Sequence, residues 1–304
     1  MADGIGTWHG DLMHIGTGVP DPIGVAGFAS FFGQSGDWYR GRDDDPYSAC
    51  IVVCDRPSAS DPFSGGLPAS GERADEEHAV SAAMSALLGM FSLFDSEERL
   101  SDRVSLWCSS RIRKIVKHAH GAKWRRLLEM AVQSGIPAVL ADCADGGTVS
   151  ARAVCFAPMR ASEQPKELRN LQVSGFELEH AGPPSSTPWE PEVSYMRRGS
   201  HAVAENAHEG RHWLDIVVNA GIPMSTGKAV AQAGHAVQVS LGKLGEQKVL
   251  LWGADGFPVS FARGDISVDE IGRHPLASIN DAGFTEVKPG SNTAVSYFRI
   301  PPAA

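Results

Sequence analysis

The chain has 304 residues, 42% of them hydrophobic, and its 36 acidic against 27 basic side chains give a formal net charge of -9 at pH 7. This length allows two domains with sizeable cores. The acidic balance excludes binding to nucleic acid through overall charge, so any RNA contact requires a local basic patch.

No apolar run is long enough to cross a membrane, and the N-terminus lacks a basic segment followed by an apolar one. We therefore expect a cytoplasmic protein without a signal peptide or a membrane partner. The odd number of cysteines, five, follows no metal-ligand spacing. Cys50 and Cys54 would lie about 13 Å apart on an extended strand, too far for a disulfide, so we expect reduced thiols.

Two groups of histidines are candidate metal ligands: His118 with His120, and His201 with His208 and His212. Neither group has a carboxylate or a cysteine at ligand spacing. No metal and no cofactor is therefore predicted.

The first 45 residues form an extension rich in glycine and polar side chains. This extension also contains aromatic residues: Trp8, Phe28, Phe31, Phe32, Trp38 and Tyr39. Because a disordered tail usually contains fewer aromatics, we expect part of the extension to pack onto the body of the protein.

Between positions 102 and 126 the sequence contains a cluster of basic residues and a single acidic one, Asp102. Apart from Arg103, we predict that its members contact RNA phosphates: Arg111, Arg113, Lys114, Lys117, Lys123, Arg125 and Arg126. A charge run is usually a solvated helix face, but this one lacks acidic partners at i,i+4 spacing. We therefore favour RNA contact.

Residues 161–212 are predicted to connect two domains. A short helix is expected at 164–171, and the segment 181–191 that follows contains three proline turns and clustered serines. Arg197 and Arg198 add a small cationic spot before the second domain. We expect no catalysis in this connector.

The second domain begins with the apolar run 214–218, predicted to be a buried strand. Pro223 breaks the strand, and Ser225 or Thr226 can cap an alanine-rich helix. Three polar side chains share one face of this helix, at i, i+4 and i+7: Lys228, Gln232 and His235. The stretch is not a phosphate-binding P-loop, because its two glycines are separated by five residues and alanine follows the lysine.

Near the C-terminus, 277–298 is predicted to form a strand, a glycine-containing turn, a second turn at Pro289-Gly290, and another strand. This stretch and the helix start together resemble the type II (archaeal and eukaryotic) peptidyl-tRNA hydrolase family. The first motif of that family is matched by Met224, Gly227, Lys228, Ala231, Gln232, His235 and Ala236. The second is matched by Asp281, Ala282, Gly283, Thr285, Gly290, Ser291 and Thr293. The chain departs from the family at Ala233, usually cysteine, and at Phe284, usually arginine.

The resemblance covers roughly the last ninety residues and implies hydrolysis of the ester between a peptidyl or N-acyl-aminoacyl group and the 3′ end of tRNA, without a required metal. The implied catalytic residues are Lys228, His235 and Asp281. Gln232, Thr285, Ser291 and Thr293 would bind the substrate. Lys228 suits a developing oxyanion, Asp281 can orient or deprotonate water, and His235 can relay a proton or bind the terminal nucleotide. Exposed amides of the helix start would assist Lys228. The identity of the general base stays open.

Residues 46–160 match the C-terminal domain and are predicted to be a degenerate copy of it. The matched segments are 51–53 with 216–218, 77–86 with 227–236, 104–107 with 249–252, and 138–142 with 277–281. In the copy, His78, Ala82 and Ser85 replace Lys228, Gln232 and His235, and only Asp142 keeps its counterpart. A chance match between two α/β units is the alternative. We favour two tandem three-layer α/β/α-type domains with mixed sheets, 46–160 and 213–304, forming either an intrachain pseudo-dimer or part of a homodimer.

Two other functions stay open. A non-catalytic RNA-binding or regulatory protein that retains the fold would also explain three features: the degenerate copy, Phe284 and the long N-terminal extension. A hydrolase of a small ester fits the same polar face but leaves the basic cluster unexplained. Without the motif match, Asp281 would be expected only to stabilise its turn and Lys228 only to be a solvated residue at a helix start.

Overall fold

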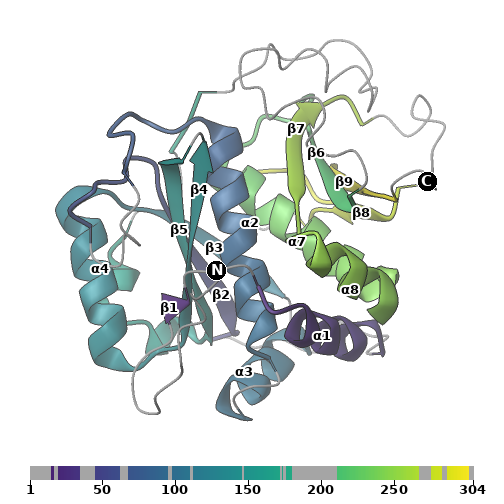
Figure 1. The fold of residues 1–304 in the computed structure, drawn as a ribbon, viewed down its shortest axis with the longest axis horizontal. Helices are drawn as coiled ribbons and strands as arrows, with labels where there is room; N and C mark the ends of the chain where they lie inside the picture. The colour runs from purple at the N-terminus through teal and green to yellow at the C-terminus, as the bar shows by residue number, and fades with distance from the viewer. Residues whose placement is uncertain are drawn as a thin grey trace, which may run out of the picture.

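The computed structural model describes residues 15–16, 20–34, 45–61, 68–94, 98–109, 112–145, 147–171, 173, 176–179, 211–266, 275–282 and 286–300. They form two α/β units, each with a mixed sheet (Figure 1). The predicted fold class, two tandem α/β domains, is therefore confirmed.

The first unit contains β1 (Ile15–Gly16), β2 (Ser48–Cys54), α2 (Glu76–Ser92), α3 (Glu98–Cys108), β3 (Arg113–His118), α4 (Gly121–Ser134), β4 (Ala138–Asp145) and β5 (Thr148–Met159). Its strand order is β1-β4-β5-β2-β3. The central strand β2 runs parallel to β3 and antiparallel to β5.

The second unit contains β6 (Trp213–Asn219), α7 (Thr226–Leu244), α8 (Glu246–Ala254), β7 (Val259–Gly264), β8 (Ala277–Asn280) and β9 (Asn292–Arg299). Its order, β7-β6-β9-β8, repeats the β3-β2-β5-β4 part of the first sheet with the same strand directions. The two units therefore share one topology, as the internal match predicted.

The long helices α2 and α7 begin in the same way. Asp75 caps α2 by accepting a hydrogen bond from the amide of His78 at 2.9 Å, and Ser225 caps α7 by accepting from the amide of Lys228 at 3.2 Å. His78 thus occupies the place of Lys228. The match at the fourth strand needs a correction, because the strand registers make Asn280 rather than Asp281 the counterpart of Asp142.

The first unit has the predicted three layers. Alternate residues of β2 point to opposite faces: Ile51 and Val53 join the core under α2, whereas Cys50, Val52 and Cys54 join the core under α4. In the second unit α7 packs on the face of the sheet that contains Ile216 and Val218. Within the described residues no helix covers the opposite face, so the structure describes two of the three layers predicted for this unit.

The two units pack through α2 and α7, which lie between the sheets (Figure 1). The contacts are reciprocal, because α7 also packs against β3 of the first unit and α2 against β7 of the second. Arg263 at the end of β7 forms a bidentate pair with buried Glu76 at the start of α2, with both N···O distances 2.7 Å. This pair joins the two units at the beginning of α2.

Part of the N-terminal extension packs onto the body, as predicted. Helix α1 (Pro22–Gln34) lies against α2, α7 and α8, and the ring of Phe28 stacks on Phe91 at 4.0 Å between centroids. A Cβ at Gly33 would meet the carbonyl oxygen of Gly242 at 2.8 Å. Glycine therefore allows the backbones of α1 and α7 to touch.

The connector begins with a 3-10 turn (Ala161–Glu163) and the one-turn helix α5 (Lys166–Arg169), which falls where a short helix was predicted. Its proline-rich part, with Arg197 and Arg198, lies outside the described residues. None of the five cysteines forms a disulfide, as expected. None of the helices that the structure describes has the length and apolar content needed to span a bilayer.

Candidate functional site

Lys228 and Asp281 meet although they are distant in sequence. Lys228 lies in the first turn of α7, and Asp281 directly follows β8. The Nζ atom of Lys228 forms an ion pair with Oδ2 of Asp281, and the two side chains are only 11% and 8% exposed. Because water largely does not reach the pair, the two charges interact more strongly than a surface pair would.

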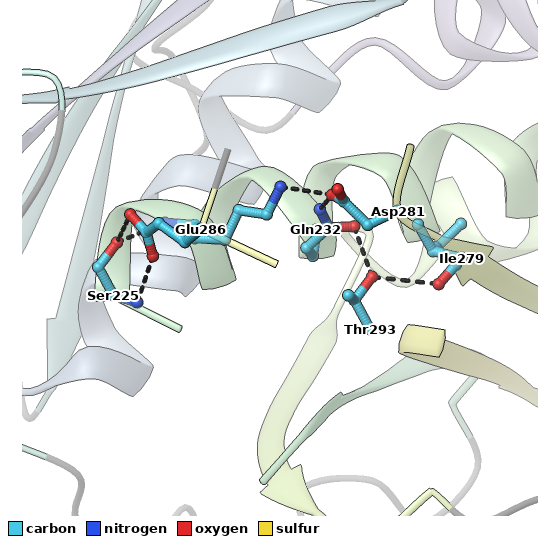
Figure 2. A network of polar contacts seen from close by, with 7 residues as sticks. Ser225, Gln232, Ile279, Asp281, Glu286 and Thr293 are labelled. Atoms are coloured by element: carbon cyan, nitrogen blue, oxygen red, sulfur yellow. Dashed lines mark hydrogen bonds and ion pairs between the residues drawn. The ribbon is translucent and has the colours of Figure 1, made fainter. Parts of the chain in front are cut away.

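Gln232 and Thr293 hold the carboxylate in place. One turn after Lys228, Nε2 of Gln232 donates to Oδ2 of Asp281 at 2.7 Å. The hydroxyl oxygen of Thr293 lies 2.8 Å from Oε1 of Gln232 and 3.1 Å from the carbonyl oxygen of Ile279 (Figure 2). Gln232 and Thr293 are buried, so the chain of bonds fixes the direction of the carboxylate.

The turn after β8 is held by main-chain bonds. The amide of Asp281 donates to the carbonyl of Ser291 at 2.9 Å, and the amide of Gly290 donates to the carbonyl of Asp281 at 2.7 Å. Gly290 has a φ of 80°, a conformation that favours glycine. Ser291, predicted to bind substrate, is half-buried and contributes its backbone to this turn. Thr285 lies outside the described residues.

Glu286 belongs to the site but was not predicted from the sequence. Its carboxylate accepts from the amide of Ser225 at 2.9 Å and from the hydroxyl of Ser225 at 2.7 Å (Figure 2). A negative charge is favourable at this end of α7. Since the amide of Ser225 binds Glu286 and the amide of Lys228 binds Ser225, these two amides are not exposed to assist an oxyanion, contrary to the sequence-based expectation.

His235 is half-buried and faces the first unit. Its Nδ1 atom lies 3.3 Å from Nζ of Lys114 in β3. Burial, followed by the nearby charges of Lys114 and Lys228, lowers the pKa of His235 well below its ordinary value. His235 is therefore neutral near pH 7, and its Nδ1 can accept a hydrogen bond from Lys114.

Two residues predicted to contact RNA are buried. Lys114 donates to Oε1 of Gln238 at 2.5 Å and lies over the ring of Trp107, at 4.9 Å from the centroid. Burial lowers the pKa of Lys114 to about 7. Lys117 donates to the carbonyl of Leu168 at 2.8 Å. Neither ammonium group faces the surface, so both residues are withdrawn from the predicted RNA-binding set.

The other predicted RNA-binding residues are distributed over separate elements. Lys123, Arg125 and Arg126 are exposed on α4, and Arg113 is half-buried at the start of β3. Arg111 lies outside the described residues. Arg103, left out of the predicted set, pairs with Glu163 at 3.2 Å. The basic surface that the structure describes here is therefore α4, and it is smaller than the sequence suggested.

In the described part of the chain, one group of three side chains has the composition and spacing to hold a metal ion. It lies in the first unit, at the ends of β2 and β3, and consists of Asp55, His118 and His120.

The chain matches no family model, and comparisons with curated proteins and with solved structures give no match either.

Proposed function

We propose that this protein hydrolyses the ester between a peptidyl or N-acyl-aminoacyl group and the 3′ ribose of tRNA. The observation that carries the proposal is the Lys228–Asp281 pair fixed by Gln232 and Thr293. All four residues belong to the two motifs that resemble type II peptidyl-tRNA hydrolases. Their meeting in a nearly buried network supports a shared chemical role.

In the proposed reaction a water molecule attacks the ester carbonyl carbon while the carboxylate of Asp281 takes its proton. The carbonyl oxygen becomes negatively charged, and the ammonium of Lys228 stabilises that charge by a charge-assisted hydrogen bond. The carbon–oxygen bond to the ribose then breaks. The ribose oxygen takes the proton held by Asp281, which leaves a free carboxylic acid and a free 3′ hydroxyl.

Of the two roles that the sequence suggested for His235, proton relay and contact with the terminal nucleotide, this proposal keeps the second. A neutral imidazole with a strongly lowered pKa is a poor proton donor near pH 7. We therefore assign His235 to neutral hydrogen bonding beside Lys228, with the terminal nucleotide as its proposed contact. Lys123, Arg125 and Arg126 on α4 are the proposed phosphate contacts, and the proposed location is the cytoplasm.

The direct test is release of free tRNA from an N-acetylated aminoacyl-tRNA by the purified full chain, with and without EDTA. We expect turnover in both conditions. Lys228→Ala or Asp281→Asn should lower kcat by about 100- to 1,000-fold, the usual effect of removing a transition-state contact. Lys243→Ala is the matched control, because Lys243 is an exposed lysine near the other end of α7.

A second candidate is a non-catalytic RNA-binding protein, favoured by the exposed basic residues of α4. It predicts salt-sensitive tRNA binding without ester cleavage, and binding that survives Lys228→Ala. Well-folded protein with this behaviour would overturn the hydrolase proposal. Cleavage of small esters without tRNA binding would instead indicate a different substrate.

A further inference from the structure

The first unit has its own cluster of polar side chains at the carboxyl ends of two parallel strands. β2 and β3 run side by side, with Val53 opposite His118. Asp55 follows β2, and His118 is the last residue of β3. His120, the N-cap of α4, lies two residues later. The spacing of His118 and His120 does not predict this carboxylate partner, because Asp55 lies more than sixty residues before the two histidines.

Three atoms of the cluster have the spacing of metal ligands. Oδ1 of Asp55 lies 2.8 Å from Nε2 of His118 and 3.5 Å from Nδ1 of His120, and all three atoms lie within 4.8 Å of one another. Ligands bonded to zinc at about 2.1 Å are separated by about 3.4 Å in a tetrahedral arrangement. A small adjustment of the side chains would therefore seat an ion.

Neighbouring residues orient the ligands. Nε of Arg73 donates to the other carboxylate oxygen of Asp55 at 3.0 Å, which directs Oδ1 toward both imidazoles. The ring of Phe176 stacks on His118 at 4.9 Å and 18°. The side chain of Asp55 is 2% exposed, that of His118 13% and that of His120 52%, so the cluster is anchored inside and open to solvent at His120.

We propose that Asp55, His118 and His120 form a binding site for a divalent transition-metal ion, with Zn²⁺ as the best fit. Two imidazoles and one carboxylate are ligands that zinc prefers, and three protein ligands leave a coordination position for water. Arg73 partly offsets the negative charge of Asp55, so the affinity is lower than that of a structural site with four protein ligands. Arg73 also acts as the orienting partner that a metal-binding carboxylate usually has.

The site is specific to the first unit. Strand register makes Arg263 the counterpart of His118, and Arg263 is paired with Glu76. The site is also close to the second unit, because the Phe176 ring that stacks on His118 lies against Gly227, where an added Cβ would meet it at 3.1 Å. The ring of Phe176 would thus lie between the ligand His118 and the start of α7. The proposal does not depend on ester hydrolysis.

Calorimetric titration of the full chain, freed of metal by a chelator, with Zn²⁺ tests the proposal. We expect one ion per chain at the cluster, and Co²⁺ at the same site should give visible absorption bands. His120→Ala removes a half-exposed ligand and should weaken this binding by more than the roughly 10- to 100-fold that loss of an outer-shell partner costs. His118→Asn is a second variant that removes a different ligand.

His212→Ala is the matched control. His212 also pairs with an aspartate, Asp255, at 2.8 Å, but no third metal-binding side chain joins that pair within the described residues. Binding that is unchanged in His212→Ala and weakened in both ligand variants would support the site. Absence of Zn²⁺ binding by the wild-type chain, or equal binding by His120→Ala with unchanged Co²⁺ absorption, would overturn it.

Discussion

Trp107 and Trp252 make the same hydrogen bond in the two units. Each indole Nε1 donates at 2.9 Å to a carbonyl oxygen six residues further along the chain, that of Arg113 or of Pro258. Both tryptophans are buried, and each bond ties a helix, α3 or α8, to the edge strand that follows it. The repeat therefore extends from the order of elements to an individual side-chain bond.

This equivalence predicts that Trp107→Phe and Trp252→Phe have similar effects. Each change leaves a carbonyl oxygen without its donor and creates a small void, so each should lower the free energy of unfolding by about 1 to 3 kcal/mol. Urea unfolding of the full chain measures this. Leu251→Ala, which shortens an exposed neighbour on α8, should have little effect. A large loss in one tryptophan variant and none in the other would contradict the equivalence.

Much of the fold could be predicted from apolar runs and turns. The run 214–218 became β6, Ser225 caps α7, and the two strands near the C-terminus became β8 and β9. These features are local, because a strand in a sheet interior needs a continuous apolar run and a helix start needs a capping side chain. Shared topology also followed from local patterns repeated in the same order.

The contacts of the polar residues were harder to predict, because they depend on distant elements. The run of basic residues predicts one surface, but a strand between two helices divides it. On β3, Lys114 and Val116 share the face that packs toward α7, so Lys114 is buried. Glu286 binds Ser225, which lies 61 residues earlier in the sequence, and no local sequence pattern predicts this contact. The same is true of Asp55 and its histidines.

Thr293 tests whether the polar network of the site matters for its chemistry. Thr293→Val keeps the shape of the side chain but removes the hydroxyl next to Gln232 and Ile279. The free energy of unfolding should therefore fall by about 1 to 3 kcal/mol. Ester cleavage should also fall, since Gln232 no longer holds Asp281 firmly. Thr293→Ser retains the hydroxyl and should keep most of the cleavage rate. Equal rates for the two variants would show that the network is not needed for catalysis.

The charges on α4 give a prediction about RNA. Replacing Lys123, Arg125 and Arg126 together by Gln should weaken tRNA binding and reduce the slope of log affinity against log salt by about 2 to 3. Titrations of labelled tRNA at several salt concentrations measure that slope. The matched control replaces three exposed lysines on other helices: Lys166, Lys243 and Lys248. If both triple variants lose the same amount, α4 is not the RNA-contacting surface.

Lys114 should make stability depend on pH. Burial lowers its pKa in the folded protein to about 7, whereas the ordinary value is 10.5. Below about pH 7 both states hold the proton, and the cost of burying the charge is fully present. Between about pH 7 and pH 10.5 the unfolded chain binds more protons at this lysine than the folded protein does. The contribution of Lys114 to stability therefore rises with pH, by at most about 1.4 kcal/mol per pH unit.

The groups that face Lys114 have titrations of their own. Burial lowers the pKa of His235 well below its ordinary value, so His235 is largely neutral in both states across this window. Burial raises the pKa of Cys108 from 9.0 to about 12 and also raises the pKa of Cys155, so above about pH 9 the unfolded chain loses these thiol protons first and stability falls with pH. The contribution of Lys114 is therefore measured by a comparison in which both proteins contain the same thiols.

Comparison of wild-type protein with Lys114→Met isolates the effect. Methionine is of similar size and carries no charge, so the stability of the wild type relative to this variant should rise steadily from about pH 7 to about pH 9.5. Urea unfolding across that range measures the difference. Lys243→Met, at an exposed position on α7, should show no such rise. If the difference in free energy of unfolding between the wild type and Lys114→Met stays constant with pH, Lys114 keeps its proton when the chain folds, held by Gln238 and His235 despite its burial.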